Sequence, residues 1–240
     1  MKGTAIVTGG GGVLCAEFSC ALGAEGYEVA VLDLNLEAAQ RTVRNITAAG
    51  GTAKAYQANV LDKENLEAVR QEIRKDFGKC RILINGAGGN NPKCTTAHEE
   101  YEKGDESRGD ILTFFNLPKE NFEFVFDLNL MGTLLPTQIF ARDMLGETGC
   151  SVLNISSMNA FTPLTKIPAY SAAKVRLRPI LMTVLSMVFG LVPLMMAHGV
   201  GANGSRSLAT GVIGGMIVGT LALLFLVPSL FIVFQYIQER

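Results

Sequence analysis

Cysteine and histidine are scarce in this chain of 240 residues, which has five cysteines and two histidines. The cysteines show no CxxC spacing, and no histidines cluster near them. Buried or surface thiols are therefore a better interpretation than a metal site or a disulfide framework, and we expect no bound metal. The five are Cys15, Cys20, Cys80, Cys94 and Cys150.

The amino terminus lacks the features of a signal peptide. In MKGTAIVTGG the apolar run is three residues long, and glycines follow it rather than a cleavage site. The chain before Arg176 also lacks a basic stripe, because it carries 17 Lys and Arg against 21 Asp and Glu, a net charge of −4. We therefore expect a cytoplasmic location for this part and no nucleic-acid partner.

Charge is nearly absent from the carboxy-terminal part. From Arg176 to the end only five residues are charged, and neither lysine nor cysteine occurs after Lys174. A step in composition as abrupt as this one marks a domain boundary. We predict two domains, residues 1–175 and residues 176–240.

Two long uncharged runs occupy the second domain, 18 residues at 180–197 and 32 residues at 207–238. A bilayer needs about 20 apolar residues per helix. A buried core helix is the alternative, but runs of this length favour membrane spans. We predict an α-helical transmembrane hairpin through 180–238 that anchors the chain in the lipid bilayer of the inner membrane. The positive-inside rule then places both chain ends in the cytoplasm.

The first domain alternates apolar runs with helical patterns. The alternation predicts an α/β fold, a Rossmann-type doubly wound parallel sheet of about five strands with helices on both faces. A polar insertion at 90–117 is too long for a simple connection, so it is either functional or mobile. The predicted strands are 4–10, 27–33, 52–60, 80–89 and 150–157, and the predicted helices are 15–26, 36–51, 64–78 and 120–145.

A glycine-rich loop, Thr8-Gly9-Gly10-Gly11-Gly12, lies between the first predicted strand and the first predicted helix. Glycines let the backbone approach a pyrophosphate, which the N–H groups at a helix start can bind. Asp33 ends the second predicted strand, 21 residues after Gly12. A carboxylate there binds ribose hydroxyls and repels a 2′-phosphate, which predicts NAD rather than NADP. The other role open to Asp33 is that of a helix N-cap.

Four polar side chains form a candidate catalytic set: Asn129 in the long helix, Ser157 at the end of the fifth strand, Tyr170 and Lys174. The last two are four residues apart, so they share one helix face. The pKa of a free tyrosine is about 10, and a neighbouring cation lowers it. Ser157 could hold a substrate oxygen on which charge develops.

With these motifs in this order, residues 1–175 resemble a short-chain dehydrogenase/reductase. The resemblance implies that Tyr170 is the general acid/base, that Lys174 binds the nicotinamide ribose, that Ser157 contacts the substrate carbonyl and that Asn129 joins a proton relay. The implied cofactor contacts are Thr8, Gly9, Gly10, Gly11, Gly12, Val13, Leu14, Asp33, Asn59, Val60, Asn85, Gly86, Ala87, Gly88 and Lys174.

Two details of the sequence refine this resemblance. The loop departs from the family pattern TGxxxGxG, with Val13 and Cys15 at the later glycine positions. The insertion and the segment DLNLMGTLLPTQIF are similar to the branch that interconverts fructuronate and mannonate. The implied substrate is therefore a sugar acid.

The tail is similar to a different family. RLRPILMT, GVGANG and ATGVIGGMIVGTLALLFLVPSLF resemble the last two membrane helices of a resistance-nodulation-division efflux transporter. That resemblance implies that Arg176 and Thr183 belong to a proton relay whose other members would lie on further helices.

Three interpretations stay open at this point. The chain is an NAD-dependent sugar-acid oxidoreductase joined to a membrane hairpin, a fragment of a proton-driven transporter, or a chimera in which neither function is intact. The later elements of the dehydrogenase family cannot be recognised after Val175, which favours the chimera as the origin of the chain. The sequence leaves open whether the chain forms a homo-oligomer.

Overall fold

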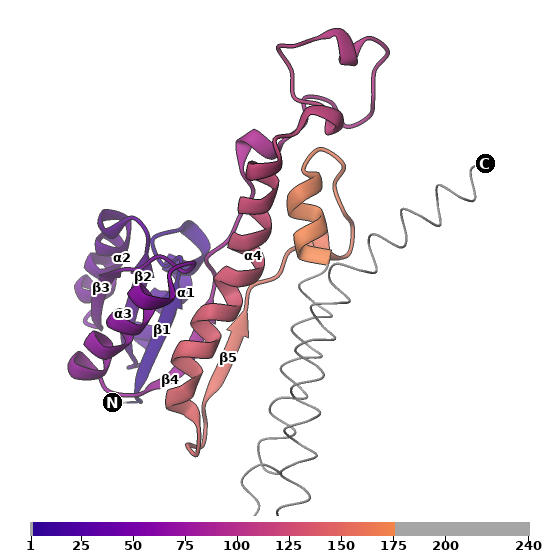
Figure 1. Ribbon diagram of the computed structural model, residues 1–240. Coiled ribbons are helices and arrows are strands. Elements are labelled where there is room, and N and C mark those ends of the chain that lie inside the picture. The colour runs from indigo at the N-terminus through magenta and orange to yellow at the C-terminus, as the bar shows by residue number, and fades with distance from the viewer. Residues whose placement is uncertain (1, 176–240) are drawn as a thin grey trace, which may run out of the picture. The chain divides into compact units, whose positions relative to one another are not determined.

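The computed structural model describes residues 2–175 (Figure 1). The predicted membrane hairpin, Arg176 and Thr183 lie outside these residues. The strands are β1 Thr4–Thr8, β2 Glu28–Asp33, β3 Thr52–Gln57, β4 Cys80–Asn85 and β5 Ser151–Asn154. The helices are α1 Val13–Ala24, α2 Leu36–Ala48, α3 Lys63–Asp76 and α4 Lys119–Phe140, and residues 168–175 are also helical.

The five strands form one parallel sheet in the order β3-β2-β1-β4-β5. The central strand β1 pairs with both β2 and β4, so the chain first builds the sheet outward on one side and then continues on the other. The place where the order reverses leaves a crevice at the carboxyl ends of β1 and β4, where open α/β sheets bind ligands. This confirms the predicted five-stranded Rossmann-type sheet.

Helices cover both faces of the sheet because side chains alternate between the faces along each strand. Ile6 and Leu32 belong to a core cluster that includes residues of α3 and α4. Val7 and Val31 point to the other face and pack with residues of α1 and α2. All four of these strand residues are buried, and the apolar runs that predicted the strands are explained by burial on both faces.

The strands and helices differ from their predicted bounds mainly at the ends. Each strand is shorter than predicted, and β1 already ends at Thr8 because Gly9 adopts a positive φ of 66° that breaks the extended run. The first helix begins earlier than predicted, at Val13. The long helix ends at Phe140, and a 3₁₀ turn, Ala141–Met144, continues it.

Among residues 2–175, one helical stretch, Lys119–Met144, is long and apolar enough to cross a membrane by length and composition. It packs within the fold: Val125, Ile139 and Phe140 are buried, and the last two belong to the core cluster beneath the sheet. Figure 1 shows α4 lying beside β4 and β5. A core helix explains its composition.

The insertion between β4 and α4 is folded onto the rest of the domain. The Thr96 N–H donates to the carbonyl oxygen of Lys166 (2.8 Å), and the buried Cys94 packs against Val125 and Ala169. The insertion therefore contacts the residues that immediately precede Tyr170 along the chain. Figure 1 shows it beyond the amino-terminal end of α4, next to residues 168–175.

Charged groups tie together the amino edge of the sheet, at the opposite end from the crevice. The Asp143 carboxylate is buried and pairs with Arg70 and with Arg74 (3.4 Å to Arg74). The same carboxylate accepts a hydrogen bond from the N–H of Cys80 (3.4 Å), the first residue of β4. One side chain thus joins α3, the turn after α4 and the sheet.

Candidate active site

A groove of about 530 Å³ follows the carboxyl ends of β1, β2 and β4. Its wall contains most of the predicted cofactor contacts, namely Gly9, Gly12, Val13, Leu14, Asp33, Asn59, Val60, Gly86, Ala87 and Gly88. Six wall residues were missed from the sequence: Cys15, Leu34, Ala58, Leu61, Phe124 and Leu128. All six are apolar residues, and the sequence does not show whether an apolar residue lines a groove or lies in the core.

The glycine loop lies against the end of β4 at very short range. A Cβ on Gly9 would come within 2.9 Å of the backbone of Ala87, and Gly9 has the left-handed φ that favours glycine. Gly10 and Gly11 do not line the groove but pack beneath it, where a Cβ would meet Val31 and Ala38 respectively at 2.6 Å. Gly10 and Gly11 thus lie directly behind the wall of the groove, and their contact with a cofactor stays a prediction.

The start of α1 faces the groove with its backbone N–H groups unblocked. Gly12 is the N-cap residue and makes no side-chain cap, and the first turn carries no acidic residue. Free N–H groups and the positive end of the helix dipole suit a phosphate at this place. The geometry agrees with the predicted pyrophosphate site.

Asp33 holds the loop as well as lining the groove. Its Oδ2 accepts a hydrogen bond from the N–H of Gly11 (3.0 Å), and its Oδ1 accepts one from the N–H of Asn35 (2.9 Å). The N-cap of α2 is Asn35, whose side chain accepts from the N–H of Ala38. The alternative role of Asp33 as the N-cap is therefore wrong.

Thr8 and Asn85 act from below the groove. The buried Thr8 hydroxyl accepts hydrogen bonds from the N–H groups of Gly86 (3.1 Å) and Ala87 (3.2 Å), so it shapes the end of β4. The Asn85 amide donates to the Thr137 hydroxyl and to Asn154 Oδ1, both at 2.8 Å. The side chain of Asn85 thus turns into the protein between α4 and β5, and a cofactor contact at Asn85 stays a prediction.

Asn129 is fully buried in α4 and binds the backbone just after β4. Its amide donates to the carbonyl oxygens of Gly89 and Val125, both at 2.8 Å, and its Oδ1 accepts from the N–H of Gly89 (3.1 Å). A polar residue among apolar ones in this helix therefore has a reason. It holds the inner end of the groove.

Lys174 reaches the same place from the helix at residues 168–175. Its Nζ lies 5.4 Å from the ring centre of Tyr170 and 3.6 Å from the position that a Cβ on Gly88 would take. Only 5% of Lys174 is exposed, and this burial lowers the pKa of its ammonium group below the ordinary value of 10.5. The structure thus places Tyr170 and Lys174 side by side, as the helix spacing predicted, and brings Lys174 and Asn129 together at the end of β4.

Ser157 lies three residues beyond the end of β5, so its predicted place at the end of the strand is wrong. Its hydroxyl caps the 3₁₀ turn Met158–Ala160 by accepting from the N–H of Asn159 (3.2 Å). The side chain of Asn159 in turn donates to the Ser171 hydroxyl (3.3 Å). These two residues, which the sequence offered no reason to select beyond the position of Ser171 next to Tyr170, link the Ser157 turn to the helix that contains Tyr170 and Lys174.

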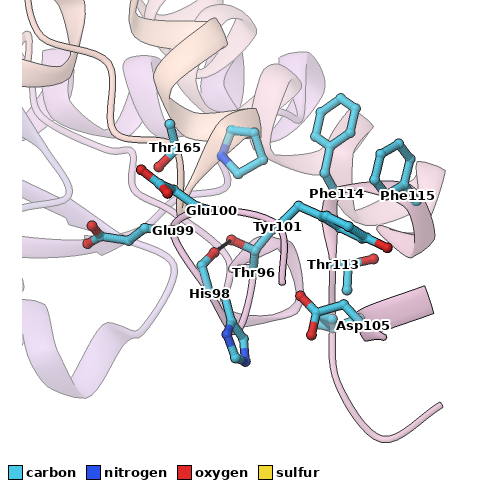
Figure 2. A pocket seen from close by; sticks show the side chains of 12 residues that line it. Thr96, His98, Glu99, Glu100, Tyr101, Asp105, Thr113, Phe114, Phe115 and Thr165 are labelled. Atoms are coloured by element: carbon cyan, nitrogen blue, oxygen red, sulfur yellow. Dashed lines mark hydrogen bonds between the residues drawn. The ribbon is translucent and has the colours of Figure 1, made fainter. Parts of the chain in front are cut away.

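A second cavity of about 320 Å³ lies in the insertion (Figure 2). Its walls include His98, Asp105 and an aromatic cluster of Tyr101, Phe114 and Phe115, together with Thr165 and Pro168 from the segment before Tyr170. The rings meet edge to face. The insertion and the segment before Tyr170 therefore enclose a cavity that shares no residue with the groove.

Residues 3–187 match the family described as short chain dehydrogenase. An uncharacterised oxidoreductase of Haemophilus influenzae is 56% identical over 171 residues, which are 70% of this chain and 59% of that protein. The oxidoreductase UxuB of Bacillus subtilis, also uncharacterised, is 44% identical over 71% of this chain and 60% of its own length. The chain thus spans about three-fifths of the length of each of these two relatives.

Solved structures show the same fold. A Haemophilus protein with bound NAD, provisionally assigned as a D-mannonate oxidoreductase, superposes with a TM-score of 0.72 at 52% identity over 78% of this chain and 66% of that one. An NAD⁺-bound xylitol dehydrogenase gives a TM-score of 0.64 at 23% identity, covering 78% and 64% of the two chains.

The tail is similar to transport proteins. Residues 163–235 match the AcrB/AcrD/AcrF family, and the multidrug resistance protein MdtF of Escherichia coli is 32% identical over 48% of this chain but only 13% of that protein. The two matched family ranges overlap at 163–187, which includes the predicted join at residue 175.

Proposed function

This chain belongs to the short-chain dehydrogenase family, and on that premise we propose that it is an NAD-dependent oxidoreductase acting on a hydroxyl or carbonyl group of a sugar acid. The observation that carries the proposal is the convergence of Asn129, Tyr170 and Lys174 at the inner end of a glycine-walled groove. We propose that the enzyme domain consists of residues 1–175.

The groove fits NAD on its own geometry. The glycine loop and the uncapped start of α1 suit the pyrophosphate, and the carboxylate of Asp33 lies in the wall where a ribose would bind. Asp33 already binds two backbone N–H groups, which keeps its charge in place. A 2′-phosphate beside that charge would be repelled, so we propose NAD rather than NADP.

In the proposed reaction the hydroxyl of Tyr170 exchanges a proton with the substrate oxygen as that oxygen gains or loses charge. Lys174 holds Tyr170 and the nicotinamide ribose, and the Ser157 hydroxyl donates to the substrate oxygen. Asn129 holds the backbone at the end of the groove. We propose that it also takes part in a proton relay. NAD, when bound, supplies the hydride acceptor.

A sugar acid of the fructuronate and mannonate type is proposed as the substrate. The support is the similarity over the same residues to the Haemophilus protein assigned to D-mannonate. This chain covers 66% of that structure. Both the substrate and the ability of this chain to turn it over are therefore proposed.

Two measurements test the function separately. The purified chain should quench or enhance NADH fluorescence on binding, and Asp33→Ala should weaken that binding by at least about tenfold, since a hydrogen bond to a charged group contributes about 1.5–3 kcal/mol. Absence of saturable NADH binding would exclude the cofactor assignment. Tyr170→Phe should bind NADH normally and lose turnover of mannonate by about 10²–10⁴-fold, and turnover that survives would exclude the proposed acid/base.

For the tail, we propose that residues 176–240 are a transporter-type membrane hairpin and that the chain is a chimera of two families, with the enzyme domain in the cytoplasm at the inner membrane. The similarity of the tail to efflux transporters supports this, and the proposed relay at Arg176 and Thr183 would be incomplete. DNA reads from the source should cross codons 174–176 with even coverage if the join is genuine. A break in coverage there would identify an assembly artefact, and the chain in the soluble fraction would exclude the anchor.

A further inference from the structure

The insertion contains a cluster of three potential metal ligands that takes no part in the groove. The atoms that His98, Glu102 and Asp105 can offer to an ion all lie within 4.8 Å of one another. His98 Nδ1 is 2.6 Å from Glu102 Oε1. Figure 2 shows His98 and Asp105 on the same side of the insertion cavity, which both residues line.

The turn between these residues is shaped to bring them together. The N–H of Asp105 donates to the Glu102 carbonyl oxygen (3.0 Å), and the N–H of Glu102 donates back to Asp105 Oδ2 (3.1 Å). Gly104 closes the turn with a φ of 104°, a left-handed conformation that other residues rarely adopt. The three side chains are therefore placed by the backbone and not only by attraction between them.

Asp105 provides an independent reason to expect a cation. Asp105 is only 5% exposed. Within residues 2–175 no basic group lies at salt-bridge distance from its carboxylate. Its Oδ2 accepts a hydrogen bond from the N–H of Glu102 (3.1 Å), and nearby Arg108 pairs with Asp110 instead (3.5 Å). A buried carboxylate without a positive partner is costly unless a proton or a metal ion neutralises it.

We propose that His98, Glu102 and Asp105 bind a divalent first-row transition-metal ion. One imidazole nitrogen with two carboxylate oxygens suits Zn²⁺ or Mn²⁺ better than Mg²⁺ or Ca²⁺, which prefer oxygen ligands throughout. Metal–ligand distances of about 2.0–2.2 Å require the more distant ligand atoms, which lie up to 4.8 Å apart, to draw closer, and His98 Nδ1 and Glu102 Oε1 to move slightly apart from their 2.6 Å separation. The bound ion joins the two ends of the 98–105 turn.

Mn²⁺ is the probe that tests the site, because free thiols in the chain compete more strongly for Zn²⁺. Titration of the full chain, followed by the loss of the free Mn²⁺ signal in electron paramagnetic resonance, should give saturable binding of one ion. His98→Ala and Asp105→Asn should each weaken the affinity by at least about tenfold, since even partners outside the ligand set cost about 10–100-fold.

Glu100→Gln is the matched control. It removes the same charge from a residue that lines the same cavity, and it should leave the Mn²⁺ affinity within about twofold, as expected for a diffuse surface charge. Equal weakening by Glu100→Gln, or wild-type affinity in His98→Ala and Asp105→Asn, would overturn the proposal. Absence of saturable Mn²⁺ binding to the wild-type chain would do the same.

NADH binding and circular dichroism of each variant report whether the domain is folded. His98→Ala leaves the buried carboxylate in place, so it tests the site even if Asp105→Asn unfolds the insertion. The groove and the cluster share no residue. Loss of NADH binding with Mn²⁺ binding retained would therefore count against the proposed enzyme and leave the metal site standing.

Discussion

The two edges of the parallel sheet are held by different interactions. At the amino edge, Asp143 joins Arg70, Arg74 and the start of β4 through a buried charge. At the carboxyl edge, glycines, a threonine hydroxyl and Asn129 hold the backbone at the ends of β1 and β4. The difference indicates that the amino edge serves stability, whereas the carboxyl edge uses close backbone approach to leave a groove with free N–H groups.

The largest effect on stability is expected at the amino edge, from Asp143→Asn. The substitution removes the buried one of the two carboxylates that pair with Arg70, leaving Glu67 (3.8 Å), and breaking a buried pair costs about 3–5 kcal/mol. We expect about 3 kcal/mol, because Arg74 is 44% exposed and stays solvated. Urea unfolding should record this loss, while the Kd for NADH measured well below the transition stays unchanged.

Glu147→Gln is the control for that substitution. It breaks the exposed pair with Lys79 in the same region (2.7 Å) and should not change the unfolding midpoint, since exposed pairs contribute little. If Asp143→Asn instead weakened NADH binding as much as it lowered stability, the two edges would not be separable.

Gly9→Ala should damage both stability and binding, because it acts at the carboxyl edge. The added Cβ would meet the backbone of Ala87 at 2.9 Å and would sit at a φ of 66°. Overpacking of this kind costs about 1–3 kcal/mol, and the displaced loop should lose NADH binding. Gly50→Ala has a similar φ of 84° with open space around it, so it should cost only the strain of the left-handed conformation, about 1–2 kcal/mol, with NADH binding intact.

Thr4 and Thr8, at the two ends of β1, allow a matched comparison. Thr8→Val leaves the N–H groups of Gly86 and Ala87 without their acceptor. It should lower the free energy of unfolding by about 1–3 kcal/mol and raise the Kd for NADH. Thr4→Val removes one bond to the carbonyl oxygen of Phe77 (2.7 Å) and should cost about 1 kcal/mol with no change in Kd. Equal effects on Kd would contradict the division between the edges.

The smallest effect on stability is expected from Lys174→Met. Burial lowers the pKa of Lys174 below 10.5, so between the two pKa values the unfolded chain binds more protons than the folded chain, and wild-type stability at this site rises with pH. The methionine variant should match or exceed the wild type near neutral pH and lose this advantage as the pH approaches 10.5.

Turnover, in contrast, should be lost in Lys174→Met at every pH. Chemical unfolding at a series of pH values checks the stability difference, with Lys166→Met, an exposed lysine in the same segment, as the control. A difference that grows with rising pH would show that Lys174 is not destabilised by burial.

Periodicity and composition were sufficient for the fold class, since a parallel sheet covered on both faces needs apolar strands between amphipathic helices. The Tyr170 and Lys174 pair could be predicted in the same way, because helical spacing alone places residues four apart on one face. Ten of the predicted cofactor contacts line the groove. They could be predicted because the loops that follow the central strands of a parallel sheet lie at the carboxyl ends of those strands, where the crevice forms.

Local patterns could not decide which atoms each side chain binds. Asp33 holds Gly11 instead of capping α2, Asn85 turns away from the groove, and Ser157 lies beyond β5 rather than at its end. Each outcome depends on partners 22 to 69 residues away, or on where strand pairing stops.

The sequence by itself therefore determined the order of strands and helices along the chain. It also determined which residues meet through short-range spacing, because both follow from the repeats of the helix and the strand. Only the tertiary structure decided the division of work between the two edges of the sheet and the closeness of His98, Glu102 and Asp105 in the insertion. The contacts at the two edges arise from the order of the strands within the sheet, and the cluster in the insertion arises from a turn that is not α-helical, so neither follows from helical or strand periodicity.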